Sequence, residues 1–199
     1  MESKGEIPAG NLQGESVSPL VRAYLEFNHL KQLYRQGWLQ RGLPPERCES
    51  VAEHTLGVVV LAWWLAESRF PALDVDRVLR LALVHDFGEI YAGDFTPQDG
   101  IEPEEKSRVE GEAVRQVFER LPQGDRYLAL WEEYEAGTSP EARFVRQVDR
   151  LEMAFQASVY ELQGFREMDD FFASARRAVT ELELRGLLDE LDDLRPAGN

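Results

Sequence analysis

Helical periodicity runs through nearly the whole chain, and it is the feature that most restricts the possible fold. Apolar residues recur three and four positions apart, whereas the strict alternation typical of strands is scarce. The pattern predicts about seven helices, over residues 17–36, 50–68, 74–93, 102–121, 124–136, 138–163 and 168–194. The connections are short, and no segment supplies a parallel sheet. We therefore expect an all-α fold.

Local residue choices mark where three of these helices begin. Ser50 and Glu53 match a capping box, in which the serine caps the helix and the glutamate reaches back to the Ser50 amide. Asp74 suits the cap of the next helix. Pro103 suits the first turn of the one after that, where its missing N–H costs nothing. These signals place helix starts independently of the apolar pattern.

The chain of 199 residues fits a single domain with a substantial core. It contains no internal repeat, no low-complexity tract and no evident linker. The first sixteen residues are polar and contain glycine, which is typical of a loose terminus. We expect a flexible arm over residues 1–16, a domain over 17–194 and a short tail over 195–199.

Composition excludes several classes of protein. The N-terminal residues lack the apolar core of a signal peptide. The longest apolar stretch, residues 58–66, is too short to span a bilayer, which needs roughly 20 residues. The single cysteine, Cys48, cannot form an intramolecular disulfide, and its neighbours carry no nucleophile signature. We expect a cytoplasmic protein with no membrane partner and an inert thiol.

The charge is unevenly distributed. The formal net charge is −15, which disfavours binding to a nucleic-acid polymer. Residues 17–48 nevertheless carry five basic and two acidic side chains, a local net charge of +3. This basic region fits a small anionic ligand, although a solvated helix face followed by a loop would have the same composition.

Ionisable side chains interrupt one of the most apolar segments, "RLALVHDFGEIYAGD". His85 and Asp86 follow the apolar run of residues 79–84, and Glu89 comes one helical turn later. Residues three and four apart share a helix face, so these groups converge. Imidazole and carboxylate groups are costly in a core unless each has a partner. A metal ion is one such partner.

Two further residues have comparable surroundings. His54 precedes the apolar run of residues 56–66, and Asp149 flanks an apolar helical stripe. With His85 and Asp86 they make a set of two imidazoles and two carboxylates, which suits a divalent ion such as Mn²⁺, Co²⁺, Fe²⁺ or Zn²⁺. The alternative is a core histidine beside a helix-end carboxylate. The third histidine, His29, has no second candidate ligand at helical spacing apart from Glu26, and we expect it to be a packing or surface residue.

The ordered series H…HD…D resembles the HD-domain superfamily of metal-dependent phosphohydrolases. The segments "LKQLYRQGW", "ESVAEHT", "LALVHDFGEIYAGD", "EEKSRVEGEA", "LWEEYE" and "FVRQVDRLEMAFQASVYE" are similar, in order, to its 5′-deoxynucleotidase branch. The similarity extends over residues 30–161, and "HDFGEIYAGD" and "VRQVDRLEM" are the most specific parts. The resemblance implies a single helical HD domain whose core helices carry the H…HD…D site.

The resemblance also assigns roles to individual residues. It implies metal ligands at His54, His85, Asp86 and Asp149, proton transfer by Glu89, and substrate contacts by Asp94 (sugar), Arg35 (phosphate) and Trp38 (sugar pocket). If Arg35 does not bind the phosphate, the next candidates are Lys31, Arg41 and Arg47. Purely structural roles stay open for three of these residues: Glu89 as a surface carboxylate, Trp38 as a packing residue and Asp94 as a cap.

The activity implied is metal-dependent hydrolysis of deoxyribonucleoside 5′-monophosphates to nucleoside and phosphate. We expect the ion to polarise the phosphoryl group and acidify water, Asp86 or Glu89 to orient that water, and Glu89 to protonate the leaving group. Members of the branch are commonly homodimers. Two alternatives remain: hydrolysis of a triphosphate or of a cyclic or bridged nucleotide, and a metal-holding scaffold without turnover.

Overall fold

The computed structural model describes residues 1–7 and 17–195. They form α-helices and short 3₁₀ turns, with two isolated bridges and no strand among the described residues. The all-α prediction is confirmed. The α-helices of this part of the chain are α1 (Pro19–Phe27), α2 (Gln36–Gln40), α3 (Val51–Arg69), α4 (Val75–Val84), α5 (Glu89–Ala92), α6 (Pro103–Phe118), α7 (Gly124–Ala136), α8 (Pro140–Leu162), α9 (Asp169–Ala178) and α10 (Leu182–Leu194). The 3₁₀ turns are η2 (Asn28–Lys31), η3 (Pro45–Arg47) and η4 (Pro97–Asp99).

The predicted helix starts are confirmed. The Ser50 amide donates to Glu53 Oε2 at 2.7 Å, and the Glu53 amide donates to Ser50 Oγ at 3.3 Å, which completes the capping box. Asp74 Oδ1 accepts from the amide of Arg77 at 3.2 Å. Pro103 is the first residue of α6. The N-terminal turn of α3, which carries His54, is therefore fixed by its own sequence.

Three helices differ from the predicted ranges. In place of the single helix predicted over 17–36, the structure has the shorter helix α1 followed by the 3₁₀ turn η2. The one over 74–93 is interrupted after α4 by a turn over residues 85–88, so the His-Asp pair lies in a turn rather than within a helix. The one over 168–194 divides into α9 and α10, because Gln147 Oε1 accepts from the amides of Thr180 and Glu181 and ends the helical ladder there. The short helix α2 lies in what was predicted as a loop.

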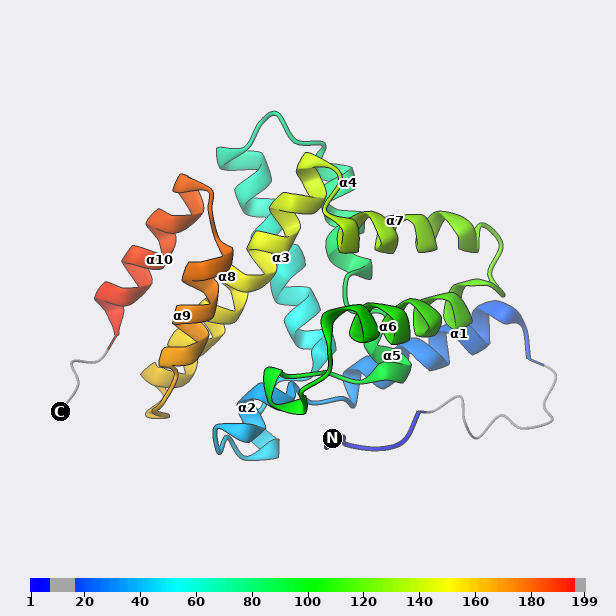
Figure 1. Cartoon of the computed structure of the whole chain (residues 1–199), viewed down its shortest axis with the longest axis horizontal. Coiled ribbons are helices and arrows are strands. Elements are labelled where there is room, and N and C mark those ends of the chain that lie inside the picture. The colour runs from blue at the N-terminus through cyan, green and yellow to red at the C-terminus, as the bar shows by residue number, and fades with distance from the viewer. Residues whose placement is uncertain (8–16, 196–199) are drawn as a thin grey trace. The chain divides into compact units, whose positions relative to one another are not determined.

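The chain divides into two compact units. The first contains Met1–Thr55 and Leu83–Ala136, and the second contains Leu56–Ala82 and Gly137–Asn199. In the first unit, α6 packs beside α5 and α7 (Figure 1). In the second, α8 packs beside α9 and α10 (Figure 1). The predicted domain boundaries stay a prediction, and residues 8–16 of the predicted arm and 196–199 of the tail lie outside the described residues.

The core of the first unit surrounds the turn that carries the His-Asp pair. Its buried side chains come from α1, η2, α3, α6 and α7 and from both sides of the 85–88 turn: Ala23, Leu30, Leu33, Val51, Val84, Ile90, Val114, Val117, Phe118 and Trp131. Phe87, within the turn, stacks on Phe118 with ring centroids 5.3 Å apart. Apolar packing on both sides of the turn thus holds the polar residues 85, 86 and 89 in place.

An ion pair between a buried glutamate and an exposed arginine also stabilises this unit. Glu26 on α1 is 1% exposed, and its Oε1 accepts from the Arg120 guanidinium at 2.8 Å. Arg120→Ala is expected to lower the free energy of unfolding by about 1–2 kcal/mol, because Glu26 loses a charged donor that solvent partly screens. Urea denaturation would measure the loss. Arg115→Ala, which replaces an exposed arginine of α6, is the control. Equal stability of the two variants would contradict the assignment.

Candidate functional site

Two imidazoles converge on one carboxylate in the first unit. His54 comes from the capped end of α3, and His85 and Asp86 come from the turn after α4. Nε2 of His85 lies 3.0 Å from Asp86 Oδ2, and Nε2 of His54 lies 3.8 Å from the same oxygen. The two rings meet nearly edge to face, with centroids 5.5 Å apart. Three atoms of the kinds that bind metals therefore lie close together.

The surroundings of this cluster hold the rings in that orientation. His54 and His85 are 1% and 4% exposed. The ring of Tyr134 on α7 packs against His85 with centroids 5.4 Å apart. Burial opposes ionisation of Asp86, but the adjacent imidazoles of His85 and His54 hold the pKa of its carboxyl well below the usual range. The carboxylate is therefore ready to bind a cation.

Glu89 lies at the start of α5, next to the cluster but turned toward Arg35. Its Oε1 is 3.7 Å from an Arg35 guanidinium nitrogen, and its Oε2 is buried with no hydrogen bond from any described residue. Burial, followed by the negative charges of Asp86 and Asp94, raises the pKa of Glu89 well above its usual value. A carboxyl group with a raised pKa is suited to donate a proton.

Arg35 joins Glu89 to a second carboxylate. Its guanidinium donates to Asp94 Oδ1 at 2.7 Å, and Asp94 Oδ2 accepts from the Gln36 amide at 2.6 Å. Asp94 is 5% exposed and caps α2, the helix that begins just after Arg35. A second bond, from Gln40 to Thr96 Oγ1 at 3.0 Å, ties the same helix to the loop after Asp94. Arg35, Glu89 and Asp94 therefore form one charged network beside the imidazoles.

Trp38 and Asp149 are each buried. Trp38 is 2% exposed, and its indole N–H donates to Glu49 Oε1 at 2.8 Å. Asp149 belongs to the second unit, where it is 7% exposed on α8, with Arg150 Nε 3.7 Å from its Oδ2. The roles of both residues stay predictions.

Cys48 and His29 take no part in the cluster. Burial, with the charge of Glu49, raises the pKa of the Cys48 thiol to about 12, so it is protonated and inert. His29 is half-buried in η2, and burial lowers its pKa. Neither residue offers a competing site.

Glu110, a buried carboxyl on α6, has no role predicted from the sequence. Its Oε1 lies 3.5 Å from Lys106 Nζ one turn earlier, and burial raises its pKa to about 7. Its Cβ and Cα lie so close to Gly88 that no side chain would fit there. The sequence indicated this residue only through the four-residue spacing of Lys106 and Glu110 within "EEKSRVEGEA", which is typical of an ion pair on one helix face.

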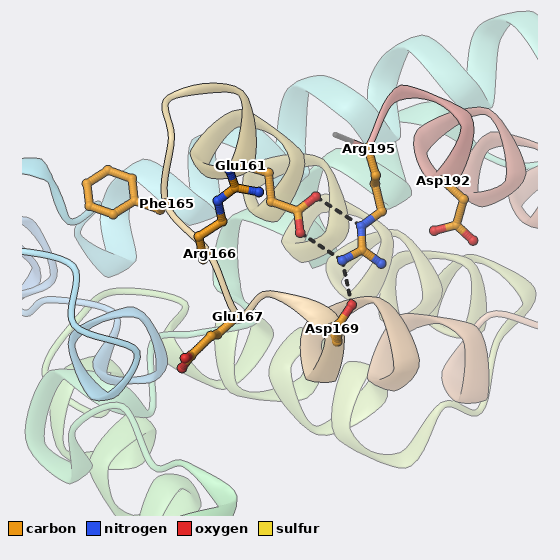
Figure 2. Close-up of a pocket in the computed structure, with 7 residues that line it drawn as sticks. All are labelled: Glu161, Phe165, Arg166, Glu167, Asp169, Asp192 and Arg195. Carbon is orange, nitrogen blue, oxygen red and sulfur yellow. Dashed lines mark hydrogen bonds and ion pairs between the residues drawn. The ribbon is translucent and has the colours of Figure 1, made fainter. Parts of the chain in front are cut away.

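Figure 2 shows a cavity of about 480 Å³ in the second unit. It is lined by Glu161, Phe165, Arg166, Glu167, Asp169, Asp192 and Arg195 and shares no residue with the imidazole cluster. Arg195 donates to both oxygens of Glu161, at 2.9 and 2.8 Å, and to Asp169. These bonds fasten the end of α10 to α8 and α9, which is a structural role.

Comparison with known proteins identifies the architecture. A family model described as "HD domain" matches residues 27–189. The chain belongs to the HD-domain family. The His-Asp pair of the 85–88 turn lies within the matched residues, and the resemblance inferred from the motifs is confirmed.

Several relatives of this HD domain have named activities. The chain is 37% identical to 5′-deoxynucleotidase HDDC2 of Homo sapiens, over 94% of this chain and 91% of that protein. It is 34% identical to 5′-deoxynucleotidase hdd1 of Schizosaccharomyces pombe, over 72% and 74% of the two chains.

Solved structures also resemble this chain over most of its length. The PH0347 protein from Pyrococcus horikoshii OT3 matches with a TM-score of 0.73 and 31% identity, over 88% of this chain and 99% of that one. A predicted metal-dependent phosphohydrolase from Magnetospirillum magnetotacticum MS-1 matches with a TM-score of 0.65 and 29% identity, over 88% and 95%. Family membership and the cluster together indicate a divalent-metal site.

Proposed function

We propose that this HD-domain protein is a 5′-deoxynucleotidase, which hydrolyses deoxyribonucleoside 5′-monophosphates to deoxynucleoside and phosphate. The observation that carries the proposal is the convergence of His54 and His85 on Asp86, beside Glu89, whose Oε1 lies 3.7 Å from the Arg35 guanidinium and whose pKa is raised by burial. A metal-binding cluster, an acid and a fixed cation are the groups that phosphomonoester hydrolysis needs. The named activities of the relatives support the same reaction.

The residues fit a divalent ion because their donor atoms are of the right kind and already grouped. His54, His85 and Asp86 supply two imidazoles and one carboxylate, a set that suits Mn²⁺, Co²⁺, Fe²⁺ or Zn²⁺. When bound, such an ion supplies Lewis acidity toward a phosphoryl oxygen and toward water.

Asp149 is the carboxylate that we assign as the fourth ligand. Asp149 is the last member of the H…HD…D series, and the HD-domain match over residues 27–189 includes it. This place in the motif supports Asp149 as the partner of the histidines.

The protein's own side chains then carry out the remaining steps. Arg35 binds the phosphate through its guanidinium, whose planar geometry suits paired contacts to phosphate oxygens. Asp86 orients the attacking water. Glu89 gives its proton to the sugar oxygen as the P–O bond breaks, so that the nucleoside leaves as a neutral alcohol. Asp94 holds the sugar, and Trp38 shapes the pocket around it.

Glu89 argues against a non-catalytic scaffold, because a module that only held metal would have no need of a buried carboxyl with a raised pKa beside it. Hydrolysis of a triphosphate or of a cyclic nucleotide is the alternative within the family. A phosphate-release assay with dAMP, dCMP, dTMP and AMP in Mn²⁺ or Co²⁺ tests the proposed activity against these two alternatives. Release from the deoxynucleotides supports the proposal, and no release from any of them with metal bound would overturn it.

The remaining assignments concern the protein's surroundings. The net charge of −15 supports a small nucleotide rather than a nucleic-acid polymer as the partner. The single cysteine supports a reducing compartment, the cytoplasm. Within the described residues, every helix is too short or too polar to cross a bilayer.

We assign a homodimer on the basis of α3. Leu56, Trp63 and Trp64 lie on one side of this helix and are 62%, 44% and 63% exposed, which is unusual for such large apolar side chains. Trp64→Glu is expected to convert the dimer to a monomer, because burying the new charge between two copies is unfavourable. Light scattering after size exclusion would measure the mass, with Trp64→Phe as the control. A monomeric wild type would contradict the assignment.

A further inference from the structure

The first residues of the chain lie alongside the segment that leads into α2. The N-terminal segment, Met1–Glu6, forms an antiparallel bridge between Ser3 and Leu33. The Lys4 amide donates to the Gln32 carbonyl at 2.7 Å. Figure 1 shows this end of the chain near α2. The segment therefore pairs with the backbone just before Arg35, the residue assigned to the phosphate.

Gln36 connects this segment to the charged network. Its side-chain carbonyl accepts from the Glu2 amide, and its side-chain NH₂ donates to the Glu2 carbonyl, each at 2.8 Å. The NH₂ also donates to the Tyr34 carbonyl at 2.8 Å. Its backbone amide donates to Asp94 Oδ2, while Arg35 donates to the other oxygen of that carboxylate. Gln36 is 7% exposed, so these bonds form away from water.

The segment also contacts Gly93, the residue that precedes Asp94. The Met1 side chain packs against Gly93, leaving no room for a Cβ there. Gly93 has φ +83°, a conformation that glycine adopts without strain. The backbone that presents Asp94 is therefore fixed by Met1 on one side and by Gln36 on the other. The contact of Met1 with Gly93 and the bonds of Glu2 to Gln36 are both made by the N-terminal segment.

We propose that Gln36, held by the N-terminal segment, is a positioning residue that fixes Arg35 and Asp94 for substrate binding. The inference rests on the proposed function, in which these two residues hold the phosphate and the sugar. The side chain of Gln36 bonds to the backbone of Glu2 and Tyr34, so it acts on the substrate only through its neighbours. Releasing the segment therefore weakens substrate binding and leaves the chemical step unchanged.

Lys4→Pro tests this without changing the site. Proline has no N–H, so the bond from position 4 to the Gln32 carbonyl is lost. Lys4→Ala is the matched control, because it removes the same side chain and keeps the amide. The position is exposed, so neither change disturbs the core. Gln36→Met is the second variant, with a side chain of similar size that cannot form the bonds to Glu2.

Steady-state kinetics on a deoxynucleoside monophosphate give the decisive comparison. Lys4→Pro and Gln36→Met are expected to raise KM about tenfold and to change kcat less than about twofold, with Lys4→Ala like the wild type. Equal KM values for Lys4→Pro and Lys4→Ala, or a fall in kcat alone, would overturn the inference.

Hydrogen exchange separates this inference from the proposed function. A wild type that releases no phosphate would refute the function alone. The positioning role then depends on the amide of Gln36, which donates to Asp94. Its exchange should be about tenfold faster in Lys4→Pro than in Lys4→Ala. Equal exchange rates would overturn the positioning role whatever the activity.

Discussion

Glu89→Gln is expected to reduce kcat by about 100- to 10,000-fold while the protein keeps its metal. Glutamine has nearly the same size and can still contact Arg35, but it cannot donate a carboxyl proton to the leaving sugar oxygen. Glu89 is buried next to the cluster rather than within it, and burial raises its pKa, which favours the protonated form. Initial-rate kinetics and metal content per chain would be measured on the same preparation.

The control for this change is Glu112→Gln. Glu112 is an exposed carboxylate on α6 that pairs with Arg108 at 2.6 Å, so Glu112→Gln makes the same chemical substitution without touching the site. We expect it to retain wild-type kcat. Normal turnover by Glu89→Gln would show that the leaving group obtains its proton elsewhere, and the catalytic assignment would be wrong.

His85→Ala is expected to abolish metal retention, with the affinity for Mn²⁺ or Co²⁺ falling by more than about 100-fold. The His85 imidazole lies 3.0 Å from the Asp86 carboxylate and is packed against Tyr134, so no neighbouring side chain can take its place. A bound ion also stabilises the fold, by about 2.7 kcal/mol at a metal concentration 100 times Kd. Thermal unfolding with and without metal would measure both effects.

His29→Ala provides the comparison. It removes the histidine of η2, which lies outside the cluster, and is expected to show the same rise in melting temperature with metal as the wild type. His85→Ala should show none. A metal-dependent rise in the His85→Ala variant equal to that of the wild type would mean that the ion binds at another place.

Helix starts were predictable from sequence because capping is local. Ser50 and Glu53 satisfy each other's polar groups within one turn, and Asp74 caps the amide of Arg77 three residues on. The same locality explains the cluster. His54 is placed by its capped helix, and His85 and Asp86 are neighbours that follow an apolar helix.

Other features depend on residues distant in sequence, and no local pattern indicates them. The division of α9 from α10 requires Gln147 of α8, which accepts from the amides of Thr180 and Glu181. The pairing of the N-terminal segment with Leu33 and Gln36 joins residues that lie far apart along the chain. The N-terminal segment is polar and lacks periodicity, so its sequence does not predict which part of the chain it pairs with.

Anomalous diffraction from a crystal of the Co²⁺-loaded protein, recorded at the cobalt absorption edge, would locate the metal itself. We expect one strong peak per chain, about 2.0–2.2 Å from Nε2 of His54, Nε2 of His85 and a carboxylate oxygen each of Asp86 and Asp149. A cobalt peak elsewhere, with the two imidazoles left unbound, would contradict the metal site and the hydrolytic mechanism built on it.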